Sequence, residues 1–152
     1  MKPKTLAITA ILLWAISAAF VGFTYVKGTT VTAVDDREAV VLEPAELDFV
    51  LVEMRGFLAA VQEIIAAANT GDMDAARKTS KSFGLALANT TPPETVKKLP
   101  KAFKQLAFST HEGFDEVSLA ADMGSEAVME ALEGTLSVCV SCHEVFRFTL
   151  SK

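Results

Sequence analysis

The sequence predicts an all-α protein: an antiparallel up-down-up-down four-helix bundle that follows an N-terminal transmembrane helix. An uncharged apolar run opens the chain, and four later segments repeat apolar residues every three or four positions, the period of an amphipathic helix. Short links containing Pro, Gly or Asp separate these segments, and short links join antiparallel neighbours in helix bundles. No segment has the pattern of a paired strand.

Residues 1–27 predict a membrane anchor. Lys2 and Lys4 open the chain, and no further charge occurs before Lys27. The apolar run between them is about 22 residues long and spans about 33 Å as a helix, enough to cross the hydrocarbon core of a bilayer. A cleaved signal peptide is the alternative, because small residues at positions 15, 17 and 19 suit a peptidase. Hydrophobicity continues past them to Val26, which favours an uncleaved single-pass anchor.

Residues 28–43 predict a tether between the anchor and the folded part of the chain. They are polar and β-branched and have no helical period. A strand-like piece at 38–42 is the one exception.

Residues 44–152 predict the helical domain. The first helix should begin at Pro44, which suits a first turn, and end near Asn69 before Gly71. We expect a second helix over 73–89 that begins after an Asp72 cap, a short helical piece at 94–99, a third helix from Pro100 and a fourth after Gly124. Apolar rows mark the core faces of the first and fourth helices: Leu47, Leu51, Met54, Leu58, Val61 and Ile65 in the first, and Val128, Leu132, Thr135, Cys139, Cys142 and Phe146 in the fourth.

The chain beyond the anchor is acidic. Without Lys2 and Lys4, 12 of the 14 Lys and Arg residues remain against 19 Asp and Glu, a net charge of about −7. This balance argues against nucleic acid and anionic membrane surfaces as partners, and favours a basic partner.

The motif Cys139-Val140-Ser141-Cys142-His143, near the C-terminus, is the most informative feature of the chain. Cys-x-x-Cys-His is the attachment signature of a c-type haem, in which two thiols bind the porphyrin and the imidazole binds the iron. On a helix the three side chains fall within an arc of about 100°, so one face can hold both thioether bonds and the proximal ligand. The motif therefore predicts one covalent haem c.

Three other uses of the two cysteines, a redox dithiol, half a zinc site or a disulfide, are weaker, because none of them needs the His that follows. A redox dithiol of the thioredoxin type needs a strand before its helix, and none is predicted. A zinc site needs four ligands, and the chain has only two Cys and two His, so distant His111 would have to take part.

The helical domain resembles the cytochrome c′ family and its low-spin, Met-ligated relatives. The resemblance covers about residues 44–152. It depends on the C-terminal position of the motif, the Phe146-Arg147 pair that follows it, the helix count and a Met in the first helix. It implies a four-helix-bundle haem domain and a possible homodimer. The N-terminal anchor departs from the soluble members of that family.

The second axial position of the iron decides the function. Met54 is the leading candidate, because an antiparallel bundle places the start of the first helix level with the end of the fourth, and the resemblance points to the same residue. Methionine is also a common core filler. His111 is the alternative, although its polar neighbours favour a position on the flank of its helix. An open site is the third possibility.

The sequence thus predicts a membrane-tethered, periplasmic monohaem c-type cytochrome, a carrier of single electrons to or from a membrane redox complex or periplasmic electron-transfer proteins. Lys2 and Lys4 would keep the N-terminus in the cytoplasm of a bacterium, so the haem domain faces the periplasm from the inner membrane. The alternative is a pentacoordinate haem protein that binds NO or CO as a sensor or scavenger. No nucleotide-binding, metalloprotease or nucleophile-elbow pattern indicates an enzyme.

Overall fold

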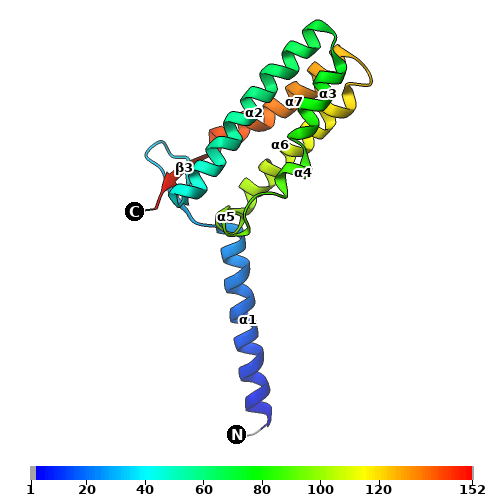
Figure 1. Cartoon of the computed structure of the whole chain (residues 1–152). Helices are drawn as coiled ribbons and strands as arrows, with labels where there is room; N and C mark the ends of the chain where they lie inside the picture. The colour runs from blue at the N-terminus through cyan, green and yellow to red at the C-terminus, as the bar shows by residue number, and fades with distance from the viewer. Residues whose placement is uncertain (1–2, 152) are drawn as a thin grey trace.

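The computed structural model describes residues 3–151 and is mostly helical, with one small sheet. The first helix, α1 (Pro3–Lys27), projects away from the rest of the chain, meets it only at its C-terminal end, and is exposed over residues 4–27 (Figure 1). Its residues 4–27 are apolar enough and long enough to cross a bilayer, a property that an N-terminal signal sequence shares.

Four longer helices make up most of the remaining chain. They are α2 (Pro44–Thr70), α3 (Met73–Ser82), α6 (Lys101–Ala120) and α7 (Ser125–Val145). The predicted end signals are confirmed: Gly71 adopts a left-handed φ of 76° after α2, and the Asp72 carboxylate accepts a hydrogen bond from the Ala75 N–H at 3.0 Å. Two short helices, α4 (Leu85–Ala88) and α5 (Pro93–Lys98), connect α3 to α6.

The predicted helix over 73–89 is interrupted at Phe83-Gly84. The Asp115 carboxylate of α6 accepts hydrogen bonds from the Leu85 N–H at 2.9 Å and from Lys81 Nζ at 3.0 Å. A Cβ atom at Gly84 would lie within 2.2 Å of this carboxylate, so only glycine allows the close approach. A tertiary contact therefore ends α3, and the local sequence does not show it.

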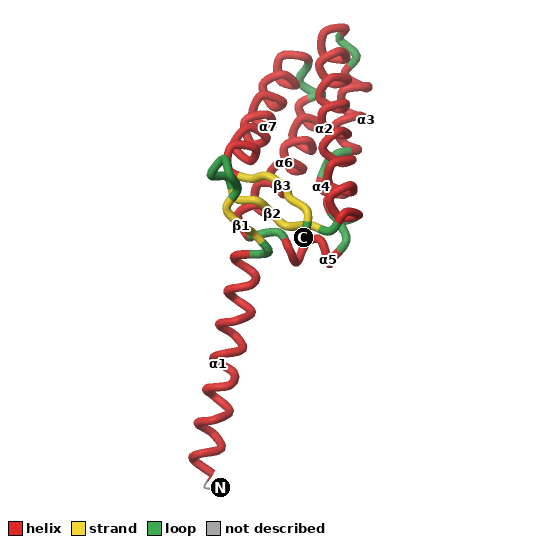
Figure 2. The backbone as a smooth tube through the Cα atoms, turned by 90° about the vertical axis from the view of Figure 1, so that its left-hand side faces the viewer, coloured by secondary structure: helices red, strands yellow, loops and turns green. Residues whose placement is uncertain are grey.

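A three-stranded sheet corrects the prediction that no segment pairs as a strand. Strand β2 (Glu38–Leu42) lies between β1 (Thr30–Thr32), which is antiparallel to it, and β3 (Phe146–Leu150), which is parallel to it. Residues 28–43, expected as a tether, are thus folded against the C-terminal segment. Figure 2 shows the sheet at the end of the helical domain next to α1.

Two apolar clusters hold the domain together. The helix core lies among α2, α3, α6 and α7, and its buried residues include Phe57, Ile64, Phe114, Val117, Val128 and Leu132. The sheet-side core joins the sheet to α2 and α6 through Val40, Leu42, Val50, Leu99, Phe103 and Phe146. The up-down-up-down order of the four helices stays a prediction.

Replacing Asp115 by Asn should lower the free energy of unfolding at pH 7 by about 1–2 kcal/mol, because a charge-assisted cap is lost. The backbone N–H of Leu85 and the Lys81 ammonium lower the pKa of Asp115 below its ordinary value of 3.8. The stability difference should therefore be complete above the unfolded-state pKa and disappear as the pH falls through the native pKa.

Urea unfolding of wild type and variant over a pH series measures this effect. Asp122→Asn is the matched control, because the ion pair of Asp122 with Arg77 is exposed and should contribute little. An equal loss in both variants, or a loss independent of pH, contradicts the account.

Candidate functional site

The Cys139–His143 motif lies on an unbroken helix. α7 continues through the motif to Val145, so Cys139, Cys142 and His143 share one side of it, as the spacing predicts. Both cysteines are free and half-buried, whereas His143 is exposed. Among residues 3–151, no group donates a hydrogen bond to the His143 ring or accepts one from it, so the imidazole is available to a ligand.

The β1–β2 turn covers the C-terminal end of α7. Arg37 donates a hydrogen bond to the His143 carbonyl oxygen at 3.2 Å and pairs with Asp35 at 2.6 Å. Asp35 also pairs with Arg147 at 3.4 Å. Arginine at this place complements the negative end of the helix dipole. Sequence patterns do not predict this contact, because they place Arg37 in a tether.

The two thiols lie in a setting unlike that of a redox dithiol. Burial raises the pKa of the Cys139 thiol, and burial together with the neighbouring Cys139 raises the pKa of Cys142 to about 11. Reactive dithiols and thiolate metal ligands work as thiolates, and their pKa values are lowered by positive neighbours. At neutral pH both cysteines are therefore protonated thiols.

Apolar side chains beside the motif are left open to solvent. On α7, Leu136 is 37% exposed and Val140 is 59% exposed, and both lie on the flank of the helix that also carries His143. On the neighbouring helix α2, Leu51 is 40% exposed and Leu58 is 72% exposed. They lie on the opposite flank of α2 from Gly56, which approaches the Phe83 ring, and from Glu63, which accepts a hydrogen bond from Thr79 of α3. An exposed apolar surface of this kind is typical of a face that binds a ligand or a partner.

Met54 lies where the two cores meet. Its side chain is partly buried and packs against both the helix core and the sheet-side core. Cys142 packs against the sheet-side core as well. The structure thus brings Met54 of α2 and Cys142 of α7 to one cluster, although they lie 88 positions apart in the sequence.

His111 lies elsewhere and is fully enclosed, at 4% exposure, whereas the sequence favoured a helix flank. Its Nδ1 hydrogen-bonds the Phe83 carbonyl oxygen at 2.8 Å, and its Nε2 lies 4.0 Å from Glu53 Oε1. The Phe57 ring packs on it, with 5.2 Å between ring centroids. Burial raises the pKa of Glu53, while the charge of His111 lowers it. The sequence does not predict that Glu53 lies beside His111. Glu53 stands between Val52 and Met54 in the sequence, and no motif there indicates a buried carboxylate.

The donor set fits a covalently bound haem better than a bare metal ion. Within the described part of the chain, no three His, Cys, Asp or Glu side chains gather as a metal site would require. The motif instead offers two neutral thiols, one free imidazole and an adjoining apolar surface, the groups that a c-type haem uses. Comparison with protein families, with curated proteins and with solved structures finds no match to this chain.

The raised pKa of Cys142 predicts that its thiol reacts slowly with alkylating reagents at neutral pH. In the unloaded Cys139→Ser variant, alkylation of Cys142 by iodoacetamide should keep accelerating above pH 9, the ordinary thiol pKa, because burial is the larger cause of the raised pKa and persists without the second cysteine. Mass spectrometry over a pH series measures the rate. A rate that levels off below pH 8 would indicate a thiolate-type redox or metal site instead.

Proposed function

We propose that this chain is a membrane-tethered monohaem c-type cytochrome that carries single electrons. The observation that supports it best is the arrangement on α7: two thiols and an imidazole without a partner among residues 3–151 lie on one side of a continuous helix that also exposes Leu136 and Val140. Haem presents a flat apolar ring with reactive vinyl groups and an iron that needs axial ligands, which accounts for every part of this arrangement.

In this proposal Cys139 and Cys142 hold the porphyrin through thioether bonds, and the His143 imidazole binds the iron. Met54 supplies the sixth ligand, because it packs in the same cluster as Cys142, whereas both ring nitrogens of His111 face protein groups. When bound, the haem supplies one-electron chemistry, cycling between Fe(II) and Fe(III). Leu51, Leu58, Leu136 and Val140 exclude water from the ring and so help to set the reduction potential.

The position of the motif supports a membrane partner. α7 ends at the sheet, and the sheet lies at the end of the domain that carries α1 (Figure 2). If α1 spans the inner membrane, the attachment site lies at the side of the domain that faces the bilayer, on the periplasmic surface. Electron exchange with a membrane redox complex is then possible over a short distance. The up-down-up-down bundle and the likeness to cytochrome c′ belong to the same proposal.

The decisive experiment is expression of the full-length chain together with haem-maturation enzymes, followed by mass spectrometry and optical spectroscopy. We expect one covalent haem per chain, its loss in Cys139→Ser/Cys142→Ser, and a low-spin spectrum with a sulfur-to-iron charge-transfer band. A chain without covalent haem contradicts the proposal.

Met54→Leu tests the sixth ligand. The charge-transfer band should disappear and the reduced protein should gain the ability to bind CO, because the distal position opens. Met73→Leu, another partly buried methionine of the helix core, is the matched control and should leave the spectrum unchanged. CO binding by the wild type would support the gas-binding alternative.

A further inference from the structure

The junction between α1 and the domain is a close-packed joint. Gly28, with a φ of 60°, lies against α5 and the start of α6, where a Cβ would come within 2.4 Å of the Lys98 carbonyl oxygen and 2.6 Å of Pro100 N. The next residue, Thr29, donates from its N–H to the Lys98 carbonyl oxygen at 2.8 Å and accepts from the Val41 N–H at 2.8 Å. These contacts fix which end of the domain faces the membrane that α1 enters.

Four lysines lie around this joint. Lys27 ends α1, Lys97 lies in α5, and Lys101 and Lys104 lie in the first turn of α6. No Asp or Glu among residues 3–151 forms an ion pair with any of these four. Lys98 differs, because it pairs with Glu46 at 2.7 Å. The four lysines are called the membrane-side lysines below.

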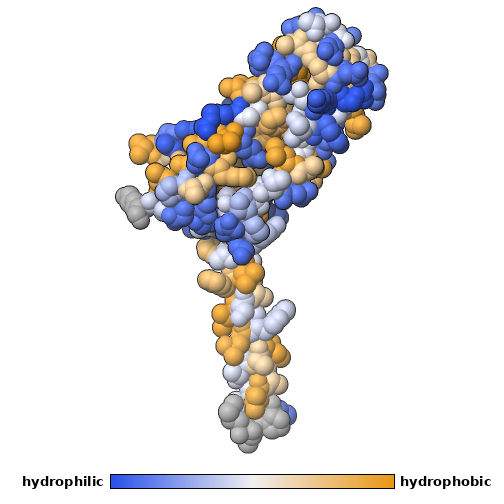
Figure 3. All heavy atoms as spheres, in the orientation of Figure 1, coloured by the Kyte–Doolittle hydropathy of each residue, from blue (hydrophilic) through white to orange (hydrophobic). Residues whose placement is uncertain are grey.

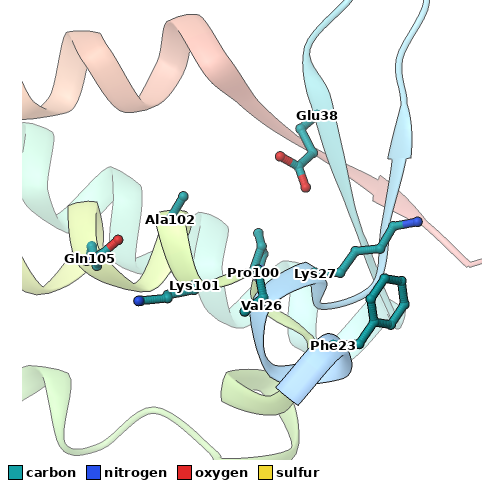
Figure 4. Close-up of a pocket in the computed structure, with 8 residues that line it drawn as sticks. All are labelled: Phe23, Val26, Lys27, Glu38, Pro100, Lys101, Ala102 and Gln105. Carbon is teal, nitrogen blue, oxygen red and sulfur yellow. The ribbon is translucent and has the colours of Figure 1, made fainter. Parts of the chain in front are cut away.

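A pocket opens between α1 and α6 at this joint (Figure 4). Phe23 and Val26 line it from α1, and Pro100 and Ala102 line it from the start of α6. Lys27 and Lys101 point outward on opposite sides of it, and Glu38 of β2 is the one acidic residue of the lining. The Glu38 carboxylate makes the pocket itself unsuited to an anion, so any anion would contact the lysines around it.

The side chains at the end of α1 are those of a lipid–water interface. Tyr25 lies under Lys104, with Nζ 4.7 Å from the ring centroid, and Phe23 lies under Lys27 at 5.6 Å. Aromatic residues gather at the headgroup level of membranes, and lysines beside them extend to the phosphates. Figure 3 shows the apolar surface of α1 giving way to a hydrophilic band where it meets the domain.

We propose that the membrane-side lysines, Lys27, Lys97, Lys101 and Lys104, bind the phosphate groups of anionic phospholipids and seat the domain on the bilayer. The inference goes beyond electron transfer and depends on α1 as the membrane anchor. The chain as a whole is acidic, so the rest of its surface is repelled from such a bilayer. This contrast gives the domain one preferred orientation.

The test uses the full-length chain in nanodiscs of phosphatidylcholine alone or with one third phosphatidylglycerol. Acetylation of each lysine by an N-hydroxysuccinimide ester is followed by peptide mass spectrometry. Labelling of Lys97 and Lys101 should fall about fivefold in the anionic bilayer, the effect of one lysine at a charged membrane surface, and recover in 0.5 M salt through screening. Lys78, exposed on α3, is the internal control and should not change.

Two variants sharpen the test. In Lys97→Gln/Lys101→Gln, the lipid dependence at Lys27 and Lys104 should weaken, whereas the matched Lys78→Gln variant should retain it. Equal labelling in both bilayers would overturn the inference and would favour an acidic protein as the partner of these lysines. Equal protection by inorganic phosphate in the neutral bilayer would overturn it as well, in favour of a free-phosphate site.

Co-flotation of the chain with neutral vesicles separates the two proposals. A chain that floats but shows no lipid dependence contradicts the lysine contact alone. Loss of flotation contradicts the anchor. Neither result depends on haem, and Cys139→Ser/Cys142→Ser should behave as wild type.

Discussion

The pairing of β3 with β2 is the contact on which the rest of the structure depends. It joins the residues that follow the Cys139–His143 motif to the residues that follow α1, in parallel register from Glu38–Phe146 to Leu42–Leu150. Hydrogen bonds within a sheet satisfy backbone groups that the apolar sheet-side core could not otherwise accommodate. Val40 and Leu42, both at 0% exposure, and Phe146, at 4%, are buried by this pairing.

This pairing also explains the placement of the candidate site. Since α7 leads directly into β3, the sheet fixes the end of the helix that carries Cys142 and His143. The β1–β2 turn then brings Arg37 to the last carbonyl groups of α7. On the other side, the same strands lead back to Gly28 and the joint with α1. One small sheet therefore links α1, the Cys139–His143 motif and the sheet-side core.

The two proposals divide the domain into surfaces with different chemistry. The flanks of α2 and α7 near the motif expose apolar side chains, which suit a buried porphyrin ring. The joint with α1 exposes lysines, which suit phosphate headgroups. Both lie toward the sheet end of the domain, so a bilayer contact through the lysines would also set the orientation of the haem relative to membrane partners.

The sequence alone determined the features that local patterns encode. The period of apolar residues gave α2, α6 and α7 nearly to their ends, Pro44, Gly71 and Asp72 marked helix boundaries, and the spacing of Cys139, Cys142 and His143 placed the motif on one helix face. Only the tertiary structure decided the features that depend on distant partners. Residues 28–43 became strands because β3 pairs with them, Gly84 ended α3 because Asp115 approaches it, and His111 was buried because Phe83 and Glu53 surround it. The net charge argues against a contact with anionic membranes, whereas the fold brings four lysines together at one end of the domain. A sum of charges over the chain carries no information on where those charges lie in space, so it could not predict this arrangement.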